Sequence, residues 1–169
     1  MFDEMTMMTS HATISVLDNK GTGTPVVFIH GNSLSKEMFL PQFEAFGDNR
    51  RIVALELPGH GSSSDADDPR RTYSLEGYAD CIGETLQKLG IGEAVVVGWS
   101  LGGHIGYELT ERHPGLSGLM TVGSPPWSGS TTDRSPDSGH FRNWPSWHRP
   151  SFLMMKPKNW PRCPATTNQ

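Results

Sequence analysis

The stretch VVVGWSLGGH, residues 95–104, decides how the whole chain is interpreted. Its first three residues are β-branched, residues 98–102 fit the pattern G-x-S-x-G, and a helical pattern follows. This order predicts a buried strand, a sharp turn that carries Ser100, and a helix. Gly98 and Gly102 are needed because only residues without bulk let the strand and the helix approach so closely. Ser100 would then lie at a helix N-terminus, where free N–H groups favour developing negative charge.

Similar apolar runs recur on both sides of this stretch. Three of them indicate buried strands, at residues 25–30, 51–57 and 116–122. Apolar residues at helical spacing predict two helices, at residues 75–89 and 101–113. Strands that alternate with helices imply an α/β fold, in which a parallel sheet is covered by helices. Residues 12–17 alternate weakly and predict an antiparallel edge strand.

The loops that follow the strands are the places to search for a site, because ligands of such sheets bind beyond the carboxyl ends of the strands. His30-Gly31-Asn32 follows the first buried strand, so the Asn32 N–H can point at the same oxyanion as the Leu101 N–H. The loop after the second strand contains His60. We interpret His60 as a packing residue of a tight turn and not as a catalytic base.

Three motifs in this order resemble the α/β-hydrolase-fold family: VVFIHGN at 26–32, LELPGHGSS at 55–63 and VVVGWSLGGHIGYELTERHP at 95–114. The resemblance covers residues 12–126 and corresponds to the N-terminal half of such an enzyme. It implies a three-layer α/β-hydrolase fold that is truncated before its last strands. It also implies a serine hydrolase that attacks an ester-like carbonyl of a small molecule, forms an acyl-enzyme and needs no cofactor or metal. The site residues that it implies are Ser100 as nucleophile, the N–H groups of Asn32 and Leu101 as oxyanion hole, and the glycines Gly31, Gly98 and Gly102 of the loop and the elbow.

The acid and the base of such a site are expected after the nucleophile, on later strands that this sequence does not show. His104 lies one helical turn beyond Ser100, and we expect it to have a packing role. No strand pattern positions the other candidates, which are His140, His148, Asp133 and Asp137. We therefore expect impaired turnover, and lyase or transferase chemistry on the same scaffold stays open.

Two other classes of protein were compared with the hydrolase. A nucleotide-binding domain would show G-x-G-x-x-G after a strand or G-x-x-x-x-G-K-[ST], and neither pattern occurs. A non-catalytic fragment or pseudoenzyme that acts only by binding remains the alternative. The reaction of Ser100 with an electrophilic probe distinguishes it from an enzyme.

Residues 127–169 differ in kind from the rest of the chain. They contain four of the five tryptophans and six of the thirteen prolines, but no valine or isoleucine and one leucine. Such a segment is not expected to form a buried strand, and we predict a Pro-, Trp- and Ser-rich disordered tail. Residues 1–11, which include Met5, Met7 and Met8, are expected to form a flexible N-terminus.

The tail also suggests a shift of reading frame. Methionine and tryptophan have one codon each, so residues 153–161, LMMKPKNWP, nearly fix their own DNA. Read from the third base, this DNA encodes Asp-Glu and further charged or small residues followed by Leu-Ala, which is a helical pattern. We therefore expect that a frameshift near residues 127–140 replaced a helical continuation of the hydrolase sequence.

Composition limits the partners that the chain is expected to have. The formal net charge of −4 argues against a nucleic-acid surface. No run of 18 apolar residues occurs and the N-terminus is acidic, so neither a membrane span nor a secretory signal is indicated, and a cytoplasmic location is expected. Cys81 and Cys163 are expected to be free thiols.

Overall fold

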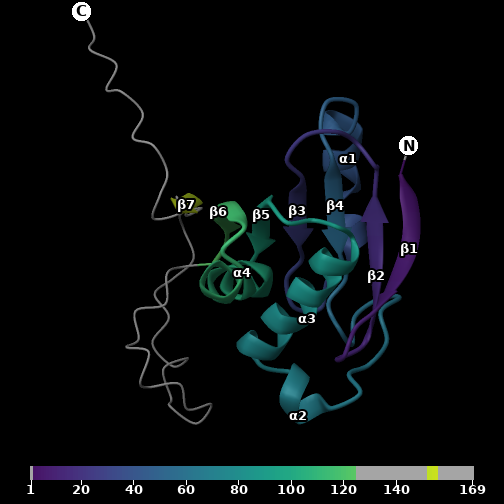
Figure 1. Ribbon diagram of the computed structural model, residues 1–169, viewed down its shortest axis with the longest axis vertical. Coiled ribbons are helices and arrows are strands. Elements are labelled where there is room, and N and C mark those ends of the chain that lie inside the picture. The colour runs from purple at the N-terminus through teal and green to yellow at the C-terminus, as the bar shows by residue number, and fades with distance from the viewer. Residues whose placement is uncertain (1, 125–151, 156–169) are drawn as a thin grey trace, which may run out of the picture.

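The fold was analysed in a computed structural model that describes residues 2–124 and 152–155. Its centre is one sheet with the strand order β1-β2-β4-β3-β5-β6-β7 (Figure 1). The parallel strands at its centre are β3 (Val26–Ile29), β4 (Ile52–Leu55), β5 (Ala94–Trp99) and β6 (Leu116–Val122). They correspond to the four apolar runs of the sequence, so the predicted parallel sheet is confirmed.

Antiparallel strands flank this centre on both sides. β2 (Thr13–Asp18) pairs antiparallel with β4, as predicted for residues 12–17, but it is not an edge strand. β1 (Asp3–Met8) pairs along it and forms the edge. The prediction of a flexible N-terminus is therefore wrong for residues 3–8. Met5 and Met7 pack against the core, and an edge strand needs only one such apolar face.

The other border of the sheet lies within the segment that was predicted to form no strand. β7 (Phe152–Met155) pairs antiparallel with β6. The prediction of a disordered tail is wrong for these four residues. Backbone pairing along the free side of a strand needs no particular side chains, which explains why composition did not indicate it. The remainder of the predicted tail lies outside the described residues.

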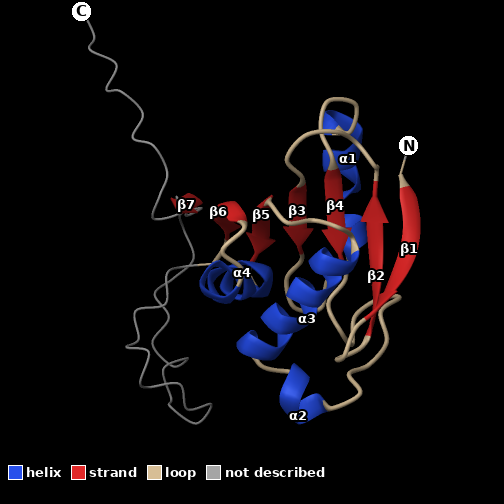
Figure 2. Cartoon of the chain, in the orientation of Figure 1, coloured by secondary structure: helices blue, strands red, loops and turns tan. Residues whose placement is uncertain are grey.

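Helices cover both faces of the sheet (Figure 2). α3 (Leu75–Lys88) and α4 (Leu101–Arg112) cover one face and correspond to the two predicted helices. A 3₁₀ helix (Lys36–Phe39) and α1 (Leu40–Phe46) cover part of the other face, where Phe39 and Phe43 contact the sheet. The short α2 (Pro69–Thr72) precedes α3. The result is the predicted three-layer arrangement of helix, sheet and helix.

Alternating residues of each strand supply the two cores. In β3, Val27 and Ile29 face α3 and α4, whereas Phe28 faces the side of α1. Because β3 pairs parallel with both β4 and β5, the carboxyl ends of these three strands lie at one edge of the sheet, where the loops with the predicted site residues begin. None of the described helices has the length and apolar character that crossing a membrane requires.

Candidate active site

Ser100 lies at the sharp turn between β5 and α4. Its backbone angles, φ 51° and ψ −114°, fall in a region that residues other than glycine rarely adopt. A side chain at position 98 would collide with the Gly102 carbonyl, and one at position 102 would collide with the Ile29 carbonyl. Neither position has room for a side chain, at 98 because β5 and α4 approach closely and at 102 because α4 begins against the end of β3.

Hydrogen bonds from the end of β6 hold the turn in this conformation. The Ser100 N–H donates to the Val122 carbonyl at 2.8 Å. The hydroxyl of buried Ser124 donates to the Ser100 carbonyl at 2.7 Å, and the same carbonyl accepts the N–H groups of Gly103 and His104. Ser124 was not identified from the sequence, because a serine after an apolar run gives no signal of its partner.

The loop after β3 lies directly against this turn. A side chain at Gly31 would come within 3.2 Å of the Ser100 Cβ atom and 3.0 Å of the Trp99 ring. The next residue, Asn32, is exposed. Leu101 is the first residue of α4, so its N–H has no intrahelical acceptor. The structure thus brings the loop of Asn32 to the helix N-terminus that carries Leu101.

His30 fixes the start of this loop through hydrogen bonds of its buried ring. It is fully buried, its Nε2 accepts the Leu57 N–H at 3.0 Å, and its Nδ1 lies 2.8 Å from the Gly31 carbonyl. Because Nε2 is an acceptor, Nδ1 carries the proton and donates it to Gly31. Burial lowers the pKa of His30, which agrees with a neutral ring.

His60 packs beside His30, with ring centroids 5.1 Å apart. Its Nε2 accepts the Ser33 N–H at 3.3 Å, so its protonated Nδ1 donates to the Pro58 carbonyl at 3.0 Å. Both ring nitrogens are engaged by the backbone. This agrees with the packing role that the sequence favoured for His60.

Lys36 and Glu56 form a buried ion pair next to these loops. Lys36 Nζ lies 3.0 Å from Glu56 Oε2, and neither side chain is exposed. Nζ also contacts the carboxylates of Glu37 at 2.8 Å and Glu4 at 3.1 Å. Burial lowers the pKa of Lys36, but hydrogen bonds to Glu37, Glu56 and Glu4 outweigh it and raise the pKa overall. The sequence analysis did not identify this pair, since nothing in the sequence brings positions 36 and 56 together.

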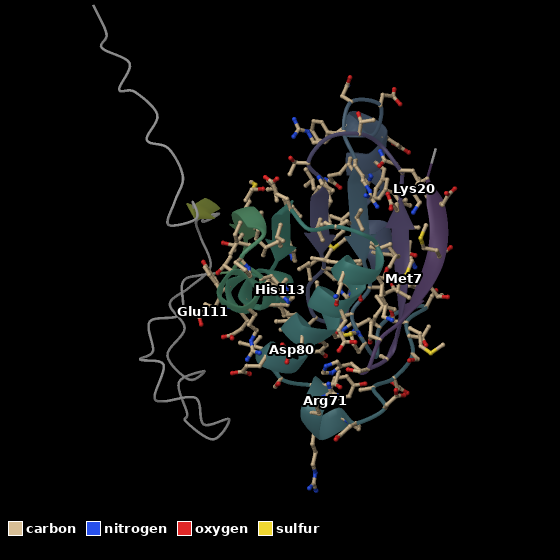
Figure 3. The ribbon with its side chains drawn as sticks, viewed as in Figure 1. Met7, Lys20, Arg71, Asp80, Glu111 and His113 are labelled. Atoms are coloured by element: carbon tan, nitrogen blue, oxygen red, sulfur yellow. The ribbon has the colours of Figure 1, made fainter. Side chains whose placement is uncertain are left out.

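A hollow of about 460 Å³ lies between the two loops. Its lining comes from the loop after β3 and the helix that follows, and from the loop after β4: Ser33, Leu34, Ser35, Met38, Gly59, His60 and Gly61. A second hollow lies elsewhere, beside α3 and α4, where Figure 3 labels the lining residues Arg71, Asp80 and His113. Only the first hollow lies beside the loops that the sequence singled out.

The other histidines, aspartates and cysteines named in the sequence analysis lie on α3, on α4 or outside the described residues. His104 lies on α4, and burial lowers its pKa. His140, His148, Asp133 and Asp137 lie outside the described residues, as does Cys163. Cys81 is a free, buried thiol, and burial raises its pKa to about 11.

A family model described as alpha/beta hydrolase fold matches residues 24–152. This match extends beyond residue 126, where the resemblance identified from the sequence ends. Three similar proteins indicate which chemistry occurs on related chains.

A crystal structure of the N-acyl homoserine lactonase AidH, as a mutant complexed with N-hexanoyl homoserine, is 51% identical over 75% of this chain, with a TM-score of 0.72. The biotin biosynthesis bifunctional protein BioHC of Teredinibacter turnerae is 38% identical over 60% of the chain. The (E)-2-((N-methylformamido)methylene)succinate hydrolase of Acinetobacter baylyi is 30% identical over 61%. The matches span 46%, 17% and 38% of these proteins, so the chain corresponds to less than half of each.

Proposed function

The chain belongs to the α/β-hydrolase family, and from this premise we propose that it is a serine hydrolase whose nucleophile is Ser100. The observation that carries the proposal is the strained turn at Ser100, which lies at the N-terminus of α4 and against the loop after β3. Backbone strain of this kind is retained where a side chain must be presented for chemistry.

The reaction follows from the groups around Ser100. Its Oγ attacks the carbonyl carbon of an ester, the carbonyl oxygen becomes an oxyanion, and the N–H groups of Asn32 and Leu101 stabilise that charge. The bond to the leaving alkoxide then breaks, the alkoxide gains the proton that the Ser100 hydroxyl has lost, and an acyl group stays on Ser100. Attack by water releases the acid and regenerates the hydroxyl.

A group must take the proton of Ser100, and the two histidines beside the loops do not serve. Both ring nitrogens of His30 and of His60 are engaged by backbone groups. We therefore propose that this chain turns over slowly. Loss of the histidine from a comparable triad costs about 10⁶ in kcat and leaves about 10³ to 10⁴ over the reaction in water.

The substrate class that we propose is a small ester, with an N-acyl homoserine lactone as its first representative. The 51% identity with a lactonase supports this choice. In a lactone the leaving alkoxide stays attached to the acyl group, so Ser100 would open the ring and water would release a hydroxy acid.

The test uses the purified 169-residue chain with p-nitrophenyl butanoate and, separately, with N-hexanoyl homoserine lactone. We expect one equivalent of p-nitrophenolate in a first turnover, a mass increase of one butanoyl group on Ser100, and slow turnover afterwards. The Ser100→Ala variant should give neither the burst nor the adduct. Slow ring opening of the lactone should also depend on Ser100.

Three results would contradict the proposal. A chain that never reacts at Ser100 would favour a protein that acts only by binding. Equal ester hydrolysis by the Ser100→Ala variant would exclude Ser100 as nucleophile. Fast, Ser100-dependent turnover would contradict the proposal that this chain turns over slowly.

A further inference from the structure

Three contacts connect the loop after β3 to the segment after β4, one at each end and one in the middle. At the start, His30 Nε2 accepts the Leu57 N–H. In the middle, the Ser33 N–H donates to His60. At the far end, Lys36 joins Glu56. The loop that carries Asn32 is therefore held along its whole length by the neighbouring segment.

The contact at Lys36 differs from the other two because it is ionic. Glu56 accepts the Lys36 backbone N–H at 3.3 Å through Oε1 and the ammonium at 3.0 Å through Oε2. Glu56 Oε2 also accepts the Ser62 N–H at 2.6 Å. One carboxylate thus binds both loops, and hydrogen bonds to ionised groups are about twice as strong as neutral ones.

Glu56 is itself fixed to the sheet. Its N–H donates to the Ser15 carbonyl at 3.0 Å, and its carbonyl accepts the Ser63 hydroxyl at 2.8 Å. Lys36, in contrast, belongs to the short helix that follows the loop. The ion pair therefore holds the far end of the loop at a fixed place relative to the sheet.

The loop needs such support because its backbone is strained. Ser33 has a φ of 59°, in the left-handed region that disfavours residues other than glycine. Asn32 and Leu34 beside it are both exposed. Packing alone would leave the Asn32 N–H free to move, whereas an oxyanion donor must be placed to within a fraction of an ångström.

We propose that Lys36 and Glu56 are positioning residues, which hold the Asn32 N–H in place for the oxyanion and set the separation of the two walls of the hollow. This inference rests on the proposed function, since it assigns a role in the reaction of Ser100. Neither side chain touches the substrate, because both are enclosed. A buried ion pair contributes little net stability against apolar residues of the same shape, but it does fix one geometry.

The experiment compares Lys36→Met and Glu56→Gln with the wild-type chain by two measurements. The first is amide hydrogen exchange of residues 31–35 and 59–62, which does not depend on chemistry at Ser100. The second is the rate of the p-nitrophenyl butanoate burst. We expect faster exchange in both loops and a burst slowed by about tenfold or more, as for a weakened oxyanion donor.

Arg51→Met is the matched control. Arg51 forms an ion pair with buried Asp18 at 2.8 Å, but it lies at the opposite end of β4. This variant should leave the exchange of both loops and the burst rate unchanged. Should Lys36→Met not fold, the isosteric Glu56→Gln decides the result at a temperature below its thermal transition.

The outcomes separate this inference from the proposed function. A wild-type chain without a burst would overturn the proposed function and the positioning role together. A normal wild-type burst with unchanged loop exchange or an unchanged burst rate in the folded variants would overturn the positioning role alone. An equal loss of burst rate in Arg51→Met would also overturn it, because the effect would then be one of general stability.

Discussion

Ser100 has a backbone conformation that costs free energy, and this cost is local. The strain at φ 51° belongs to any residue with a Cβ atom, but glycine adopts such angles readily. Ser100→Gly should therefore be more stable than Ser100→Ala by about 1 kcal/mol, although both variants lose the hydroxyl. Urea denaturation of the two variants measures this difference.

A Gly and Ala pair of variants at a second serine provides the control for this comparison. Ser15 lies within β2, where it pairs in regular register with Thr6 of β1, and glycine should be less stable there than alanine. The sign of the Gly-versus-Ala difference in the free energy of unfolding should thus reverse between positions 100 and 15. The same sign at both positions would mean that Ser100 is not strained.

At the scale of elements, the packing of α3 on α4 depends on a glycine. Figure 3 places Asp80 of α3 near His113 at the end of α4, and Asp80 also pairs with Arg112 at 2.9 Å. A side chain at Gly83 would collide with the His113 ring. Alanine favours a helix by about 1 kcal/mol over glycine, yet Gly83→Ala should destabilise the protein by about 1–3 kcal/mol because the ring must move.

The double variant with His113→Ala tests the cause of this loss. With the ring removed, Gly83→Ala should become neutral or stabilising in urea denaturation. If Gly83→Ala costs the same free energy with and without the ring, the two helices do not meet as described.

For the whole molecule, three histidines predict a loss of stability in mild acid. Burial lowers the pKa of His30, His104 and His113 below the ordinary value of 6.5. Below pH 6.5 the unfolded chain therefore binds protons that the folded chain does not. The free energy of unfolding should fall as the pH drops below 6.5 towards the lower folded-state pKa values, and it should be nearly constant between pH 7 and 8.

Denaturation at a series of pH values checks this expectation, and proton uptake on unfolding at pH 6 gives a second measurement. At lower pH the buried carboxylate of Asp18 adds a further loss. Burial raises its pKa, but hydrogen bonds from Arg51 and Lys20 lower it overall. Stability that is constant down to pH 5 would contradict the buried, neutral state of the histidines.

The sequence predicted much of the sheet and of the helical layer because these elements carry their own periodicity. The four parallel strands and the helices α3 and α4 appear close to their predicted bounds. Two short elements were not predicted because they show too little periodicity. α1 has seven residues, and the apolar face of β1 consists of Met5 and Met7. The strand β7 depends on backbone pairing with β6, for which its own sequence gives no sign.

The turn at Ser100 could be predicted from the sequence because a side chain at position 98 would collide with Gly102, only four residues away. Gly102, in contrast, is required because it lies against the Ile29 carbonyl of β3. Only the tertiary structure decided which side chains surround that turn. His30, Lys36, Glu56 and Ser124 acquire their roles from contacts between segments that lie 20 or more residues apart in the chain, such as the 27 residues between His30 and Leu57. Burial then makes these contacts strong, since a polar group removed from water must find its partner within the protein.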